Sequence, residues 1–101
     1  MPVFATTVRA RLRDADPEAA QARHNDIVAK LRPMLEPMGG TGHMVFANAE
    51  DPQEFLAMDR WESQEALAAL RDPAVQAEIA SLFDGPPQVT VWMVRDGWTA
   101  Y

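Results

Sequence analysis

The sequence contains no cysteine, no long apolar run and few basic residues, and each shortage excludes a class of protein. Without cysteine there is no disulfide framework, no thiolate nucleophile and no Cys-based zinc or iron–sulfur site. No apolar stretch is long enough to cross a bilayer, and the first residues lack the basic and apolar regions of a secretory leader. We therefore expect a cytoplasmic protein.

The charge balance argues against nucleic acid and membrane surfaces as partners. Nine Lys and Arg residues stand against 15 Asp and Glu residues, which gives a formal net charge of −6. Such a chain repels phosphates and anionic lipids. Its two histidines, His24 and His43, lie far apart in sequence, and no HExxH, EF-hand, P-loop or GxGxxG pattern occurs. We expect no metal site and no nucleotide site of a standard kind.

The length and the hydrophobic pattern predict one domain that spans residues 1–101. A chain of 101 residues that is 48% apolar has room for one core. Runs of β-branched and apolar residues with two-residue alternation predict strands. The four expected strands cover residues 3–12, 42–49, 54–61 and 88–95.

Helix start and stop signals fill the segments between the strands. Asp16 followed by Pro17 predicts an N-cap and a first helical residue, with the helix running to about Arg32. Prolines at 33 and 37 are expected to kink or end it. Ser63 can cap a second helical segment, and Asp72 followed by proline restarts the helix.

The predicted element order is βαββαβ, which is typical of an α+β ferredoxin-like fold with a four-stranded antiparallel sheet and its helices on one face. The other face then carries Leu56 and Met58, which are too apolar to leave in water. A second copy of the same sheet is the simplest cover for that face. We therefore expect a homodimer.

One segment carries a family resemblance. Asp59-Arg60-Trp61-Glu62-Ser63 closes the third expected strand and is followed by QEALAAL and, after a proline stop, by VTVWMV. This sequence resembles the antibiotic biosynthesis monooxygenase family, whose dimeric α+β barrels carry an acid-x-Trp-x-Ser segment at the end of strand three. The match spans nearly the whole chain in element order, but its specific part is Asp59 to Leu67.

In the quinone-forming members, the resemblance implies oxygenation of an electron-rich polyketide-like phenol or anthrone without flavin, haem or metal. The partners are then a small aromatic substrate and dioxygen, and no cofactor is needed. The protein supplies a base, a dry aromatic pocket and hydrogen-bond donors. Haem-degrading relatives carry an iron-binding His where this chain has Leu70, so haem is disfavoured.

The resemblance and the residue chemistry together select candidate catalytic residues. Trp61 would wall the pocket and point its indole N–H at a substrate oxygen. His24 lies on the apolar stripe of the first helix and is one candidate base. Asp59 is the other, although an ion pair with Arg9 is the simpler interpretation. Thr7 is the candidate donor, near the place of a strand-one Asn in some relatives.

Phe55, Trp92 and Leu70 are candidate substrate contacts, whereas His43 is expected to be solvated on an edge strand. The cavity itself is predicted between the helices and the sheet, lined by Trp61, Phe55, Thr7 and His24. Two other functions remain open. The protein could be a cyclase or isomerase that enolises a polyketide without using oxygen, or a dimeric carrier of a small hydrophobic ligand.

Overall fold

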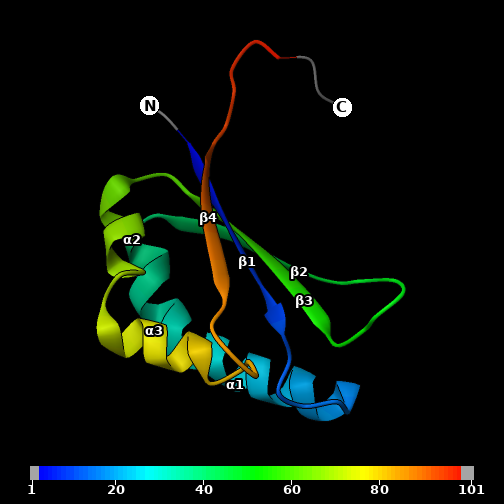
Figure 1. The fold of residues 1–101 in the computed structure, drawn as a ribbon. Coiled ribbons are helices and arrows are strands. Elements are labelled where there is room, and N and C mark those ends of the chain that lie inside the picture. Colours follow the sequence, from blue (N-terminus) through cyan, green and yellow to red (C-terminus); the bar gives the residue numbers. More distant parts are fainter. Residues whose placement is uncertain (1–2, 99–101) are drawn as a thin grey trace.

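The chain folds in the predicted alternation of strands and helices (Figure 1). The computed structural model describes residues 3–98. Its strands are β1 (Phe4–Arg11), β2 (Gly40–Ala47), β3 (Glu54–Trp61) and β4 (Gln88–Met93). Its helices are α1 (Pro17–Leu35), the short 3₁₀ helix η1 (Glu36–Met38), α2 (Gln64–Ala69) and α3 (Pro73–Ala80).

The four strands form one antiparallel sheet in the order β2-β3-β1-β4. The two central strands, β1 and β3, are not neighbours in sequence, and the edge strands pair outside them. This is the strand order of a ferredoxin-like fold, so the predicted fold class is confirmed. The third strand has the predicted bounds, whereas β2 begins two residues earlier than predicted.

The first helix runs three residues further than predicted. Asp16 caps it by accepting a hydrogen bond from the backbone N–H of Glu18 at 3.3 Å, and Pro17 occupies the first turn. Pro33 lies inside the last turn, where the missing N–H removes a single helical hydrogen bond. The chain leaves the helix through η1 and turns at Gly39, whose φ of +112° is in the left-handed region.

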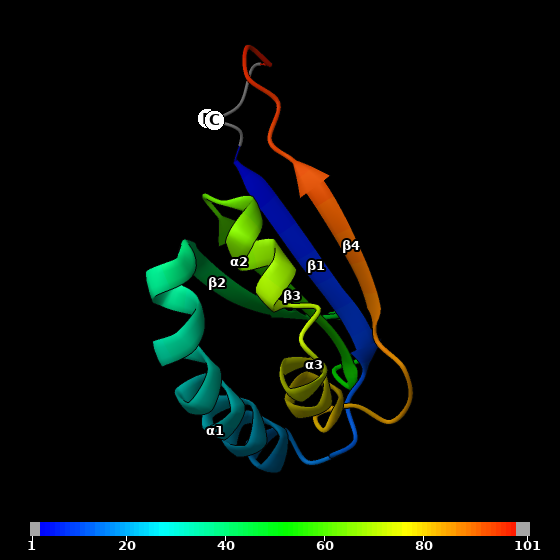
Figure 2. The same cartoon turned by 90° about the vertical axis from the view of Figure 1, so that its left-hand side faces the viewer.

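The helices cover one face of the sheet and leave the other face open (Figure 2). On the covered face, Val8, Phe55 and Ala57 from the sheet meet Ile27 of α1 and the Leu82–Phe83 segment after α3. These side chains form the core. The uncovered face, which we call the open face, carries alternate residues of the same strands, among them Met44, Leu56, Met58 and Trp92.

The end of β3 is fixed in the interior by a buried hydrogen bond. Trp61 is 3% exposed and donates its indole N–H to Thr6 Oγ1 at 2.9 Å, and Thr6 is 0% exposed. Gly40 makes room for the ring, because a Cβ at this position would lie 3.0 Å from Trp61 Cζ3. The indole is therefore held in one place by both a polar contact and a close backbone approach.

Replacing Thr6 with Val removes the acceptor while keeping the shape, so we expect the free energy of unfolding to fall by about 1 to 3 kcal/mol. The buried indole N–H then has no partner. In a Trp61→Phe background the same substitution should cost clearly less, because no donor is left unsatisfied. Urea unfolding of the four proteins of this cycle measures the coupling. Equal costs in both backgrounds would show that the hydrogen bond does not stabilise the fold.

Candidate functional site

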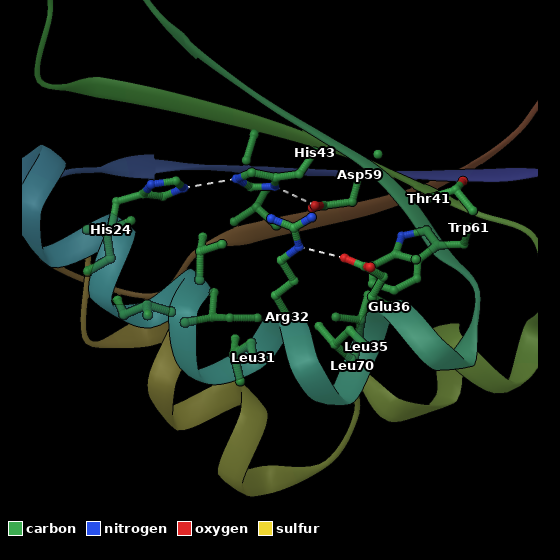
Figure 3. Close-up of a pocket in the computed structure, with 18 of the residues that line it drawn as sticks. His24, Leu31, Arg32, Leu35, Glu36, Thr41, His43, Asp59, Trp61 and Leu70 are labelled. Atoms are coloured by element: carbon green, nitrogen blue, oxygen red, sulfur yellow. Dashed lines mark hydrogen bonds and ion pairs between the residues drawn. The ribbon is translucent and has the colours of Figure 1, made fainter.

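A cleft of about 730 Å³ lies between α1 and the covered face of the sheet. Most of its wall is apolar, with aliphatic side chains from α1 and with Phe55, Trp61 and Leu70 from the sheet and α2. Polar groups gather along one part of the wall (Figure 3). They are His24, Arg32, Glu36, Thr41, His43 and Asp59. The cleft can therefore take a flat apolar molecule and present polar atoms to part of it.

Two histidines and an aspartate in this cleft form a continuous hydrogen-bonded chain (Figure 3). His43 Nδ1 donates to Asp59 Oδ1 at 2.5 Å. His43 Nε2 and His24 Nε2 lie 2.9 Å apart, and the two rings are almost parallel, with an interplanar angle of 14°. At the far end, His24 Nδ1 lies 3.0 Å from Asn25 Oδ1.

Strand register and helix spacing bring these residues together. His43 of β2 is directly opposite Asp59 of β3. Both point toward the helices because each shares its face with the residue two positions along its strand, Val45 and Ala57. The register is continuous from Gly42 to Ala47, and a one-residue irregularity precedes it between Gly40 and Gly42. His24 reaches the same place from α1, where it follows Ala20 by four residues on the face toward the sheet.

The carboxylate of Asp59 raises the pKa of His43 above its ordinary value of 6.5. The hydrogen bond from His43 to Asp59 is the main cause, partial burial of the ring opposes it, and the charge of Asp59 adds to it. The side chains of His43 and Asp59 are 36% and 22% exposed, so solvent screens part of their attraction. Arg32 of α1 donates its Nε proton to Oε2 of Glu36, the first residue of η1, at 2.5 Å, so these two rim charges form an ion pair.

The structure brings five of the seven predicted site residues to the cleft. His24, Phe55, Asp59, Trp61 and Leu70 all line it. What each of them does there remains a prediction.

Thr7 and Trp92 lie on the opposite side of the sheet, so the predicted place of Thr7 in the cleft is wrong, and Trp92, a predicted substrate contact, does not line the cleft. Thr7 pairs with Met58 and Thr90 on the open face, where its hydroxyl accepts a hydrogen bond from the Trp92 indole N–H at 2.9 Å. The neighbouring Thr6 faces the helices instead. Because side chains alternate along a strand, a parity error of one residue moves the whole set to the other face.

Two predicted interactions are also corrected. The indole N–H of Trp61 does not point into the cleft, because it is already donated to Thr6. Asp59 does not pair with Arg9: Arg9 binds Glu54 on the open face, and Asp59 binds His43. Trp61 therefore offers the cleft a ring and no donor.

His43 is the cleft residue that sequence reasoning placed wrongly, as a solvated residue of an edge strand. It does lie on an edge strand, but its ring points toward the helices and is held by Asp59 and His24. The alternation of GHMVFANA puts His43 on one face with Val45 and Ala47, and this was the signal available. Only the pairing with β3 shows that Asp59 is its partner.

Within residues 3–98, no group of three or more His, Cys, Asp or Glu side chains has an arrangement that could hold a metal ion. In the same range, no helix is both long enough and apolar enough to span a bilayer. Every buried side-chain nitrogen or oxygen of this part of the chain has a hydrogen-bond partner.

Replacing Asp59 with Asn should lower the pKa of His43 toward its ordinary value, because the anionic acceptor is lost. Imidazole ¹⁵N NMR measures this directly. Since the folded pKa of His43 is raised, the stabilisation that Asp59 adds is full below the unfolded pKa of about 6.5 and is lost as the pH rises through the folded value. Wild type should exceed the variant in stability more at about pH 6 than at about pH 9.

Asp26→Asn is the matched control, because Asp26 is exposed on α1 and does not line the cleft. It should leave the titration of His43 unchanged. A His43 titration that is the same in wild type and in the Asp59 variant would contradict the pairing.

No protein-family model and no curated protein matches the sequence, whereas many solved structures share its fold. A monooxygenase of Streptomyces coelicolor, in complex with nanaomycin D, superposes with a TM-score of 0.71 at 18% identity and covers 99% of this chain and 94% of its own. A variant of SnoaB from Streptomyces nogalater, described as a cofactor-independent oxygenase, gives 0.65 at 13% identity, with coverage of 96% and 95%.

A protein of Bordetella bronchiseptica, described provisionally as an antibiotic biosynthesis monooxygenase, gives a TM-score of 0.65 at 22% identity and covers 91% of this chain and 96% of its own. Other similar structures are of proteins described as having unknown function. At these identities the likeness concerns the fold. The chain thus has the fold of structures named as antibiotic biosynthesis monooxygenases, as its Asp59-to-Ser63 segment led us to expect.

Proposed function

We propose that this protein is a cofactor-independent monooxygenase that oxidises an electron-rich phenol or anthrone of the polyketide type to a quinone. The observation that carries the proposal is an imidazole–carboxylate pair, His43 and Asp59, on the wall of an otherwise apolar cleft. The solved structures with this fold that are named as oxygenases support it.

The base in this proposal is His43, oriented by Asp59. Asp59 accepts the proton of Nδ1, so the neutral ring carries its lone pair on Nε2. The carboxylate stabilises the imidazolium that forms when Nε2 takes a proton. The raised pKa of His43 makes the ring a stronger base than free imidazole. His24, the base candidate from the sequence, contacts this nitrogen and is a second imidazole for the same proton.

The substrate supplies the electrons. Removal of one acidic proton leaves a carbanion or phenolate that reduces dioxygen and forms a carbon–oxygen bond. Cleavage of the oxygen–oxygen bond then leaves one oxygen atom as the new carbonyl, while the other leaves as water with two substrate hydrogens. An anthrone and one dioxygen thus give one quinone and one water. The proton held by His43 returns to the departing oxygen.

The apolar part of the cleft has a separate task. The ring of Trp61, fixed by Thr6, and the ring of Phe55 form rigid walls against which a fused aromatic ring can lie. Leu70 adds an aliphatic contact from α2. A ring bound in this part of the cleft excludes water from the His43–Asp59 pair and strengthens the electrostatic effect of that pair on the reacting group.

Purified metal-free protein should consume one dioxygen per quinone formed from an anthrone or a dihydroxynaphthalene. His43→Gln should lower the rate by about 10²-fold or more, which is the usual contribution of a general base. Asp59→Asn should lower it less, and Asp26→Asn should retain the wild-type rate. Oxygen-electrode and absorbance traces recorded together measure the dioxygen consumed and the quinone formed.

If ring closure or isomerisation of a polyketide proceeds in that cleft without oxygen uptake, the protein is a cyclase or isomerase. If ligands bind and leave unchanged, it is a carrier. Either result would refute oxygenation.

We further propose that the protein is a homodimer that pairs through the open face. Met58 and Trp92 on this face are 44% and 54% exposed, and Met44 beside them is 60% exposed. Several exposed apolar side chains on one face of a small domain are typical of an interface. A second copy of the same face would cover it with like chemistry.

Met58→Asp should convert the dimer to a monomer, because the interface would bury a carboxylate without a partner. Met34→Asp is the matched control, since Met34 is 43% exposed but lies on α1. Light scattering at micromolar concentration gives the mass of each protein. A monomeric wild type, or a dimer that persists in the Met58 variant, would contradict this pairing.

A further inference from the structure

Every nitrogen of the two imidazoles in the cleft already has a partner. His43 uses Nδ1 for Asp59 and Nε2 for His24, and His24 uses Nδ1 for Asn25. The basic nitrogen of His43 is thus blocked by a residue of the same chain. A substrate oxygen cannot bind His43 Nε2 while His24 Nε2 lies 2.9 Å from it.

The number of protons that this row of hydrogen bonds needs can be counted. The row of hydrogen-bonded side chains begins at one acceptor, the Asp59 carboxylate, and ends at another, the Asn25 side-chain oxygen. Three contacts link its four members. Three hydrogen bonds need three protons, whereas two neutral imidazoles carry only two. The closed chain therefore holds one additional proton, whose charge the Asp59 carboxylate balances. When the pair is neutral, only two of the three contacts can be hydrogen bonds.

We propose that His24 is a displaceable competitor that occupies the place of the substrate's acidic hydroxyl at His43 Nε2. The inference rests on the proposed function of the cleft. A ligand with an acidic O–H replaces the His24 contact by a hydrogen bond of its own, so the exchange costs little. A ligand without such a proton binds elsewhere in the cleft and leaves the His24 contact in place. His43 is then open only to a ligand that brings the proton the reaction removes, and competition with His24 weakens the binding of that ligand.

The surroundings of His24 allow it to move. Its ring is half-buried, is bonded to the exposed Asn25 next to it in sequence, and lies tilted against Phe55 with ring centroids 6.0 Å apart. His43, in contrast, is bonded to Asp59 across a strand pair. The charged groups that share this wall are Asp59 from β3 and the ion pair of Arg32 from α1 with Glu36 from η1. Displacement of His24 therefore leaves the His43–Asp59 pair in place.

The test compares two ligands that differ by one proton donor, 2-naphthol and 2-methoxynaphthalene. Both are titrated without oxygen into wild type and into His24→Phe, at a pH at which NMR shows His43 to be neutral. Phe keeps an aromatic ring against Phe55 but cannot bond to His43. We expect the affinity ratio of naphthol to methyl ether to rise about threefold to tenfold in the variant, because the hydroxyl no longer has to displace His24 from His43 Nε2.

Imidazole ¹⁵N shifts provide the second measurement. In wild type, 2-naphthol should shift the Nε2 resonances of both histidines, and the methyl ether should leave the His43 resonance in place. His24→Ala removes the contact with His43 and also enlarges the cleft, so it shows the effect of added space. It should strengthen the binding of both ligands. An affinity ratio that is unchanged in His24→Phe, or a naphthol complex in which the His24–His43 contact persists, would overturn the proposal.

These binding measurements use no turnover. A protein that binds naphthol as expected but consumes no oxygen would refute the oxygenase function alone. A protein that oxidises its substrate with an unchanged affinity ratio would refute the role of His24 alone.

Discussion

The pairing of β2 with β3 is the constraint on which the chemistry of the cleft depends. It sets His43 opposite Asp59, and strand alternation places both side chains on the face that the helices cover. A shift of one residue would send His43 to the open face and leave Asp59 without its partner. The raised pKa of His43, the orientation of its ring and its contact with α1 all follow from this register.

A second strand pair, β1 with β3, fixes the aromatic wall of the cleft. Trp61 and Thr6 lie on paired strands and share a buried hydrogen bond, so the indole is a wall whose only donor is already used. His24 belongs to α1 and is linked to the His43–Asp59 pair by its contact with His43 Nε2. In the proposed function, Trp61 is the fixed aromatic wall, His43 is the base and His24 is the imidazole that a ligand hydroxyl displaces.

Adjacent residues of β1 make the same kind of hydrogen bond on opposite faces of the sheet. Thr6 supports Trp61 beside the cleft, whereas Thr7 accepts the same kind of hydrogen bond from Trp92 on the open face. The two interactions have the same length and the same chemistry, but only the first is buried in this chain. The difference reflects which face the helices cover.

The sequence by itself determined the element order, the strand alternation and the capped helix starts, because these depend on neighbours in the chain. It also identified Trp61 and Asp59 through a local segment, and His24 through helical spacing. It could not place Thr7 correctly or give Asp59 its partner, because both depend on pairing between segments about 16 to 55 residues apart. Only the tertiary structure, which fixes that pairing, made His43 part of the site.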